Sequence, residues 1–309
     1  SFYDIHFKFH TMLTAKDKLS LYGINAGTDM YFELKDEEYE KANGDKYYYS
    51  MKFSWKTRSN IVFGRWEHIF NEQLSSLSSL SFEKKYYKES FEQKSTYHAD
   101  DSDFWEDMNY YDYQFMNEFL WKAADNHLIK SSMLYAPHKF SIGMKMPTDV
   151  FNGNDIYEQP REYTETHYKQ KPYILQGYIQ DNWEILDRLT ANFGARYGYY
   201  DLNKDGKLSP RVSAAYGIIP KTTLRTSFGY YYQNPDVTDF FTEWGGNEDL
   251  KTQLCKHYIV GIERELPENL NLKIEGYYKG YDKLISIDAP TDKKISNGSG
   301  FSKGIELLL

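Results

Sequence analysis

The densest group of side chains that could do chemistry is a run of acids. In the segment HADDSDFWEDMNYYD, five carboxylates occupy eight positions: Asp100, Asp101, Asp103, Glu106 and Asp107. Carboxylate oxygens are the ligands that hard cations such as Ca²⁺ prefer, but the EF-hand arrangement also needs a central glycine and a set order of ligands. This segment lacks that arrangement, so we interpret it as a solvated acidic loop and predict no metal site.

Catalytic patterns are missing from the rest of the sequence. The eight histidines are scattered at positions 6, 10, 68, 98, 127, 138, 167 and 257, without the HExxH spacing of a zinc site. Cys255 is the single cysteine, which excludes an intrachain disulfide, and no serine or cysteine stands in a nucleophile elbow. Gly245 and Gly246 lack the strand–loop–helix order of a phosphate cradle. We predict that the protein is not an enzyme and has no cofactor.

The best candidate for ligand binding is an aromatic-rich stretch, YYYQNPDVTDFFTEWGGNEDL. Large rings in an otherwise polar segment often mark contact with a partner. The candidate ligand-binding residues are Tyr231, Tyr232, Phe240, Phe241 and Trp244. An equally good interpretation is that the rings anchor this segment against its neighbours or against lipid headgroups.

The elements that must position these residues are strands. In LDRLTANFGARYGYYD, apolar Leu189, Phe193 and Tyr197 alternate with polar Asn192 and Arg196. A period of two is that of a strand with one apolar and one polar face. The alternation recurs in about thirteen segments of roughly 10 residues, the length of a tilted strand that crosses a bilayer. Even FNEQLSSLSSLSFEK, which could pass for an amphipathic helix, is better interpreted as a hairpin arm.

Charged side chains occupy the polar positions of several of these strands. They are Arg196, Arg211, Arg225, Lys273 and Glu275. In a barrel these side chains would point into a wet lumen, whereas in a soluble sandwich the same positions would face solvent. We predict that they face a lumen.

The connections between the segments favour the barrel. Short turns are expected at residues 14–18, 71–73, 123–127, 186–188, 219–221 and 267–269. Longer polar connections alternate with them, at residues 35–60, 93–108, 146–171, 233–254 and 283–298, with a shorter one at 203–207. Short loops at one end and long loops at the other are typical of an outer-membrane barrel. The predicted fold is all-β: an antiparallel up-and-down transmembrane β-barrel.

Composition agrees with this fold and excludes some partners. The 37 Lys and Arg against 45 Asp and Glu give a net charge of −8, which argues against nucleic acid as a partner. Aromatic residues make up 18 % of the chain, and Tyr and Trp suit membrane interfaces. No apolar run reaches the length of a membrane helix, and SFYDIHFKFH reads as a strand and not as a signal peptide. We therefore expect the chain to begin in the middle of a structure.

The ordered motifs from Pro172 to Leu309 carry a family resemblance. The pieces are QDNWEI, LDRLT, GARY, SPRVSAAYG, TTLRTSFGYYYQNP, LCKHYIVGIERELPENLNLKIEGYYKGYDKLI and GFSKGIEL. In this order and spacing they resemble the C-terminal half of a TonB-dependent receptor barrel. Upstream, the Arg65-Trp66 pair is similar to that of a hairpin in the same family.

The resemblance implies an outer-membrane receptor that takes up a scarce nutrient. Its ligand would be a small molecule or metal chelate, of the siderophore, corrinoid, saccharide or peptide class, bound by extracellular loops and a plug. The TonB complex would drive uptake with the inner-membrane proton gradient, and outer-membrane lipid would contact Leu189, Phe193 and Tyr197. Such barrels have about 22 strands, so we expect residues 1–309 to be one barrel domain, incomplete at both ends and without its plug.

Two other functions remain open on the sequence. A passive, plugless porin-like channel of about fourteen strands would show the same alternation. A soluble β-rich binding or adhesion module would also have two-faced strands, with its polar face in water.

Overall fold

The computed structural model describes residues 1–309 except 41–43, 45, 96–101, 148–162 and 243–245. Most of the described residues belong to a single sheet of fourteen strands. The strands are β1 (Phe2–Met12), β2 (Asp17–Glu40), β3 (Lys46–Ile69), β4 (Leu74–Ser95), β5 (Ser102–Ala124), β6 (His127–Pro147), β7 (Tyr163–Gln170), β8 (Tyr173–Leu186), β9 (Leu189–Tyr200), β10 (Asp205–Ile219), β11 (Thr222–Gln233), β12 (Gln253–Glu265), β13 (Asn271–Asp288) and β14 (Lys293–Leu308).

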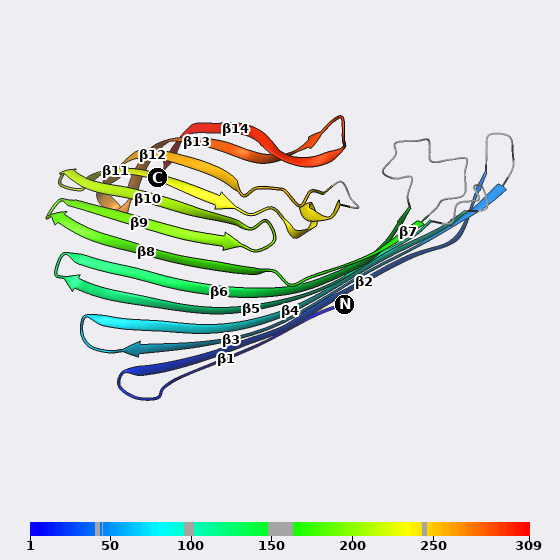
Figure 1. Cartoon of the computed structure of the whole chain (residues 1–309), viewed down its shortest axis with the longest axis horizontal. Coiled ribbons are helices and arrows are strands. Elements are labelled where there is room, and N and C mark those ends of the chain that lie inside the picture. Colours follow the sequence, from blue (N-terminus) through cyan, green and yellow to red (C-terminus); the bar gives the residue numbers. More distant parts are fainter. Residues whose placement is uncertain (41–43, 45, 96–101, 148–162, 243–245) are drawn as a thin grey trace.

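The sheet is an antiparallel meander that curves into a wall (Figure 1). Nearly every strand pairs with its neighbours in sequence, and β1 and β14 are the two edge strands of the described sheet. One strand position is shared, because β7 pairs with Phe140–Pro147 of β6 and β8 with His127–Pro137. The break between β7 and β8 falls at Pro172, which has no N–H to continue the ladder. The prediction of an up-and-down transmembrane barrel wall with thirteen to fourteen strands is confirmed.

Short and longer connections alternate along much of the chain, as predicted, but the longer connection expected at 283–298 is mostly strand, and only residues 289–292 separate β13 from β14. Short turns join the strands at one end, at residues 13–16, 70–73, 125–126, 187–188, 220–221 and 266–270. At the other end, the connection between β11 and β12 contains a 3₁₀ helix, η2 (Val237–Phe240). A second 3₁₀ helix, η4 (Pro267–Asn269), lies in the short turn between β12 and β13. No helix in the described part of the chain is long and apolar enough to span a membrane.

Several strands are much longer than the predicted 10 residues. β2 and β3 each have 24 residues, which span about 80 Å. The expected polar connection at 35–60 is therefore mostly strand, and so is much of 93–108. The reason is cross-strand pairing: polar residues there form ion pairs with residues of the neighbouring strand, such as the diagonal pair Glu38 and Lys46, whose Oε1 and Nζ atoms lie 2.5 Å apart. Figure 1 shows these strands extending well beyond the broad part of the sheet.

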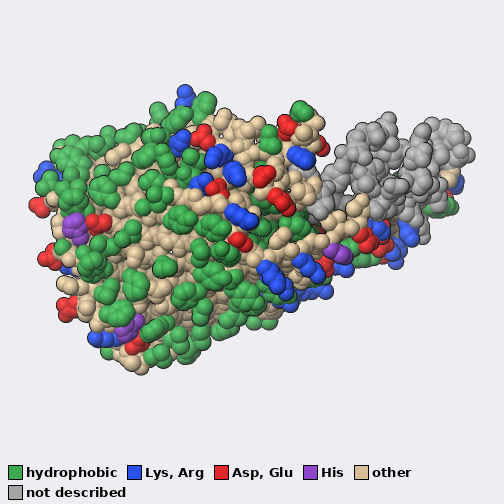
Figure 2. Space-filling view, in the orientation of Figure 1, with side chains coloured by type: hydrophobic (Ala, Val, Ile, Leu, Met, Phe, Trp, Pro, Cys, Tyr) green, Lys and Arg blue, Asp and Glu red, His purple; other side chains and the backbone are tan. Residues whose placement is uncertain are grey.

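The two faces of the wall differ, because side chains alternate along each strand. One face, called the outer face, exposes large hydrophobic side chains such as Ile179 (57 %), Phe193 (47 %) and Tyr197 (51 %). Figure 2 shows hydrophobic side chains spread over the broad part of the sheet, with charged ones gathered toward the extension. A continuous exposed apolar band of this kind is the lipid-contacting surface of a transmembrane barrel.

The opposite, inner face carries the small core of the structure. Phe240, Phe241 and Leu250, from the connection between β11 and β12, are almost fully buried. Phe241 packs with Phe140 and other residues of β6. Phe240 and Leu250 cluster with Tyr200 of β9, and partly buried residues of β8 and β13 pack against that cluster. The described residues of this connection, 234–242 and 246–252, are called the inward loop. They lie against the wall instead of projecting from it.

Candidate ligand-binding site on the inner face

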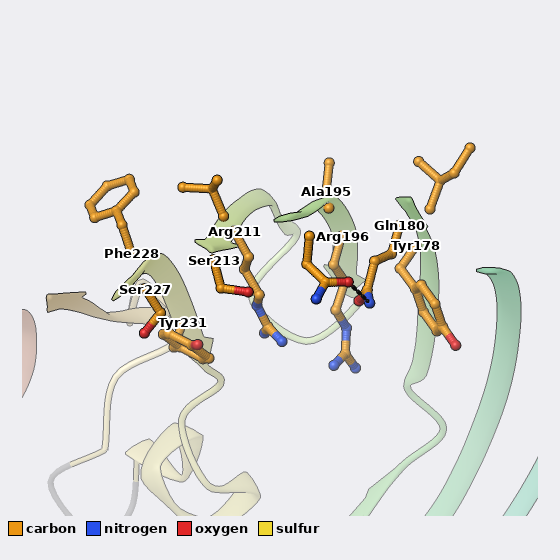
Figure 3. A pocket seen from close by; sticks show the side chains of 13 residues that line it. Tyr178, Gln180, Ala195, Arg196, Arg211, Ser213, Ser227, Phe228 and Tyr231 are labelled. Atoms are coloured by element: carbon orange, nitrogen blue, oxygen red, sulfur yellow. Dashed lines mark hydrogen bonds between the residues drawn. The ribbon is translucent and has the colours of Figure 1, made fainter. Parts of the chain in front are cut away.

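A pocket of about 370 Å³ lies on the inner face and crosses four neighbouring strands, β8 to β11. Its polar lining consists of Tyr178, Gln180, Asn192, Arg196, Arg211, Ser213, Ser227 and Tyr231. Arg196 and Arg211 point to the same side of the sheet, whereas Phe228 points to the other (Figure 3). The register places Arg211 opposite Gly194 and Arg196 opposite Ser209, so small neighbours leave room for both guanidinium groups.

The two arginines keep their charge available. Arg211 lies over the ring of Tyr231 at 4.3 Å, a cation–π contact that orients the guanidinium without neutralising it. Arg196 donates a hydrogen bond to the neutral amide oxygen of Gln176. Neither arginine forms an ion pair with a carboxylate among the residues that the structure describes. Two uncompensated guanidinium groups in one pocket can bind an anionic group such as a carboxylate or phosphate.

The other predicted lumen residues are already paired. Arg225 donates to Glu263 at 2.6 Å, and Lys273 pairs with Glu275 at 2.9 Å. Arg225 and Glu275 line a second pocket, nearer the short turns. The structure thus brings Arg196 and Arg211 together and places the other three residues in a charge-balanced group.

The predicted aromatic residues also divide into groups. Tyr231 lines the arginine pocket, and Tyr232 lines an adjacent pocket of about 100 Å³. Phe240 and Phe241 are 3 % and 1 % exposed, so their rings have no free surface with which to contact a ligand. The alternative interpretation, that these two rings anchor the loop, is the one that their burial supports. Trp244 lies outside the described residues.

Polar contacts fasten the inward loop to other parts of the wall. The Asp239 carboxylate accepts a hydrogen bond from the Nζ of Lys294 on β14 at 3.0 Å. In addition, the backbone N–H of Thr252 donates to Asp205 of β10 at 3.1 Å. The buried Asn203 side chain donates to the Thr252 hydroxyl at 3.2 Å. The loop is therefore fastened to strands that are far apart in sequence.

The acidic segment has no metal-binding geometry where it is described. Asp103 pairs with Lys145 at 2.9 Å, while Asp100 and Asp101 lie outside the described residues. In the described ranges, no group of three or more His, Cys, Asp or Glu side chains is arranged to hold a metal ion. The absence of a cofactor and of enzymatic activity stays a prediction.

Sequence reasoning missed part of the pocket lining. Tyr178 and Gln180 occupy alternate positions of YILQGYIQDNW, on the same face as Arg196. The alternation that identified Arg196 would have found them if it had been extended to β8. The convergence of Ser213 and Ser227 on the same pocket had no signal of its own, because it depends on the register of β10 and β11.

Comparison with known proteins agrees with the fold and the two-faced wall. Residues 11–309 match the sequence model of the family described as TonB dependent receptor-like, beta-barrel. An "iron-regulated outer membrane virulence protein" of Vibrio cholerae is 22 % identical over 184 residues, which are 55 % of this chain and 27 % of that protein. The chain thus matches only about a quarter of the length of this curated relative.

Solved structures of the same architecture align along nearly the whole chain. The RagAB peptide importer gives a TM-score of 0.69 at 12 % identity, covering 99 % of this chain and 43 % of that one. The pyoverdine receptor FpvA of Pseudomonas aeruginosa gives 0.64 at 13 % identity, covering 99 % and 56 %. BauA, the ferric preacinetobactin receptor of Acinetobacter baumannii, gives 0.60 at 11 % identity, covering 99 % and 57 %.

These likenesses establish the fold, and the match over residues 11–309 establishes the relationship. The outer face has the apolar band that a bilayer requires, and the curated relative is an outer-membrane protein. The chain belongs to the TonB-dependent receptor-like β-barrel family and lies in the outer membrane.

Proposed function

We propose that residues 1–309 form a single wall domain of a receptor that takes up a scarce nutrient across the outer membrane, in the class of anionic metal chelates. The observation that carries this proposal is the pair Arg196 and Arg211, which converge in one pocket without a carboxylate partner among the described residues. A wet, confined site with two guanidinium groups favours a ligand with acidic groups.

The relatives support this substrate class without deciding it. FpvA binds pyoverdine, BauA is a ferric preacinetobactin receptor, and the Vibrio cholerae relative is iron-regulated. RagAB, in contrast, is a peptide importer, and a peptide also carries carboxylates. Saccharides and corrinoids have less negative charge and would make less use of the arginine pair.

In this proposal the barrel wall does no covalent chemistry. The ligand enters at the long-connection end, and the pocket residues hold its anionic groups next to Arg196 and Arg211. A plug would complete the site, and the TonB complex would supply the energy for release. Tyr231 keeps Arg211 extended toward the pocket through their 4.3 Å contact.

The test is uptake of labelled ligands by the full-length protein in a Gram-negative strain that lacks its own chelate receptors. A panel of ferric siderophores, a corrinoid, oligosaccharides and peptides is supplied, with and without a functional TonB. We expect TonB-dependent uptake of an anionic ferric chelate. A charge-assisted hydrogen bond contributes about 1.5–3 kcal/mol, so Arg211→Gln should raise the half-saturating concentration about tenfold or more.

Arg225→Gln is the matched control, because Arg225 has the same chemistry but is paired with Glu263. It should leave the half-saturating concentration of the chelate unchanged. Equal uptake by the Arg211→Gln and Arg225→Gln variants would contradict the assigned site. Uptake without TonB, with steady conductance in a planar bilayer, would instead support the passive channel.

A further inference from the structure

The outer face changes chemistry abruptly at one level of β4, β5 and β6. Tyr113 and Tyr135 belong to the apolar band and are 47 % and 46 % exposed. Two residues beyond Tyr113, toward the long-connection end, Tyr111 lies in register between Lys84 and Lys139. Two residues of strand span about 7 Å, so both lysines lie just outside the aromatic rim of the band.

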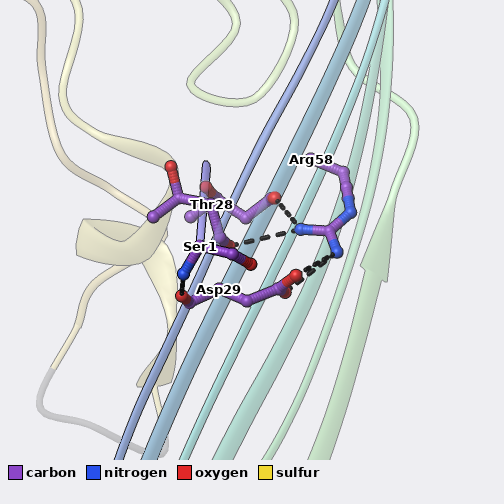
Figure 4. Close-up of polar contacts among 5 residues, drawn as sticks. Ser1, Thr28, Asp29 and Arg58 are labelled. Carbon is purple, nitrogen blue, oxygen red and sulfur yellow. Dashed lines mark hydrogen bonds and ion pairs between the residues drawn. The ribbon is translucent and has the colours of Figure 1, made fainter. Parts of the chain in front are cut away.

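These two lysines share one ring and have no acidic partner in the described structure. The Nζ atoms of Lys84 and Lys139 lie 5.5 Å and 5.4 Å from the centroid of the Tyr111 ring, which is cation–π distance. Arg58, nearby on β3, differs, because it donates to both carboxylate oxygens of Asp29, at 2.9 Å and 2.7 Å (Figure 4). The uncompensated positive charge of this surface belongs to its lysines.

A surface pocket of about 480 Å³ opens farther along the same face. Lys88 and Lys169 contribute ammonium groups to it, and Asp107, which lies opposite Lys88, contributes one carboxylate. The rings of Trp105 and His167 lie 6.2 Å apart. Gly143 makes this possible, because a Cβ there would lie 2.9 Å from His167 Nδ1 and 3.2 Å from Trp105 Cζ3. The pocket combines an aromatic ring with two ammonium groups and one carboxylate, so positive charge is in excess there, and a phosphorylated sugar can contact both the ring and the lysines.

We propose that this lysine surface and its pocket bind the headgroup of a phosphorylated glycolipid in the outer leaflet. A lipid whose acyl chains lie on the band at Tyr113 has its headgroup at the level of Lys84 and Lys139, where basic side chains attract phosphate. Four residues separate Lys84 from Lys88, which is about 13 Å of strand. The sugars extend over that distance to the ring of Trp105.

The charge pattern favours a lipid over bulk water. Farther out on the same face, Lys52 lies in register between Glu33 and Glu92, so acidic side chains compensate its positive charge. Next to the band the lysines Lys84 and Lys139 are not balanced by acids. An excess of positive charge that continues directly from a lipid-contacting band complements the phosphate layer of the membrane.

The test is native mass spectrometry of the full-length protein, purified from outer membranes and titrated with bisphosphorylated lipid A. The variant Lys84→Gln/Lys139→Gln should bind about tenfold more weakly or worse, since each lysine near an anionic lipid surface strengthens binding several-fold. The control is Lys85→Gln/Lys130→Gln. Lys85 and Lys130 lie at inner-face positions and pair with Glu83 and Glu118, both at 3.1 Å, so lipid binding should be unchanged.

The wild-type protein supplies a second test that needs no variant. Dephosphorylated lipid A and phosphatidylglycerol should both bind more weakly than bisphosphorylated lipid A. Equal binding of the wild type and Lys84→Gln/Lys139→Gln overturns the proposal, as does equal binding of phosphatidylglycerol, which would indicate general anion attraction. Nutrient uptake is measured separately, so failure here leaves the proposed function intact.

Discussion

Replacing Phe241 by alanine should release the inward loop without unfolding the barrel wall. The Phe241 ring is 1 % exposed, and its centroid lies 4.0 Å from that of Tyr168 and 6.4 Å from that of Phe140. Truncation of a buried phenylalanine costs about 3–5 kcal/mol. Because the contacts of Phe241 join the loop to β6 and β7 and are not part of the sheet ladder, the cost falls on loop docking.

Amide hydrogen exchange of the protein in detergent measures this cost. The Gly246 and Asn247 amides donate to the carbonyls of Phe241 and Asp239 at 2.8 Å and 3.0 Å, so they exchange when the loop opens. A loss of 3–5 kcal/mol in docking should speed their exchange by on the order of 10²- to 10⁴-fold, while the strand amides of β6 stay protected.

The control is Phe193→Ala, the same truncation at an outer-face ring that is 47 % exposed. Exchange at Gly246 and Asn247 should then match the wild type. If Phe241→Ala leaves the exchange of these two amides unchanged, or if Phe193→Ala accelerates it equally, Phe241 is not the anchor of the loop.

Three further changes test separate parts of the structure. Gly246→Ala should also undock the loop, because the added Cβ would lie 2.6 Å from the backbone oxygen of Asp239, which cannot move aside. Limited proteolysis of the folded variant should then cut the loop faster than in the wild type, and an unchanged cleavage rate would contradict this prediction. Ile179→Arg places a charge in the lipid band and should lower the stability of the folded barrel by about 2–4 kcal/mol near the bilayer midplane, whereas Gln180→Arg on the inner face should be tolerated. Heat-modifiability gels measure the folded fraction of each variant, and equal folded fractions would refute the assignment of the two faces. A double-mutant cycle of Asp239→Asn and Lys294→Gln, measured by amide hydrogen exchange in the loop, should give a coupling energy of about 0.2–1 kcal/mol for this partly exposed pair. A coupling energy of zero would mean that the 3.0 Å contact does not stabilise loop docking.

The fold and the two faces of the wall could be predicted from the sequence, because the side-chain period of a strand is a property of the backbone. Phe193 and Tyr197 alternate with Asn192 and Arg196 whatever the neighbouring strands are, so the alternation in the sequence was enough to predict the apolar band. The short turns were readable for the same reason: the alternation stops there.

Strand length and charge pairing depended on neighbours that the sequence does not identify. Polar residues at 35–60 looked like a loop, yet Glu38 and Lys46 pair across β2 and β3 and extend the ladder. Arg196 and Arg225 looked alike as lumen residues. Only the register shows that Arg225 has Glu263 beside it and that Arg196 has Gln176.

Whether each aromatic residue of this segment is buried or lines a pocket depends entirely on the tertiary structure. Tyr231, Phe240 and Phe241 were equivalent in sequence, as large rings in a polar segment. In the fold, Phe240 and Phe241 are buried against β9 and β6, while Tyr231 lines the arginine pocket. The burial of a ring depends on which distant strand lies opposite the loop that carries it. The curvature of the sheet, to which all the strands contribute, sets the distance between that loop and that strand.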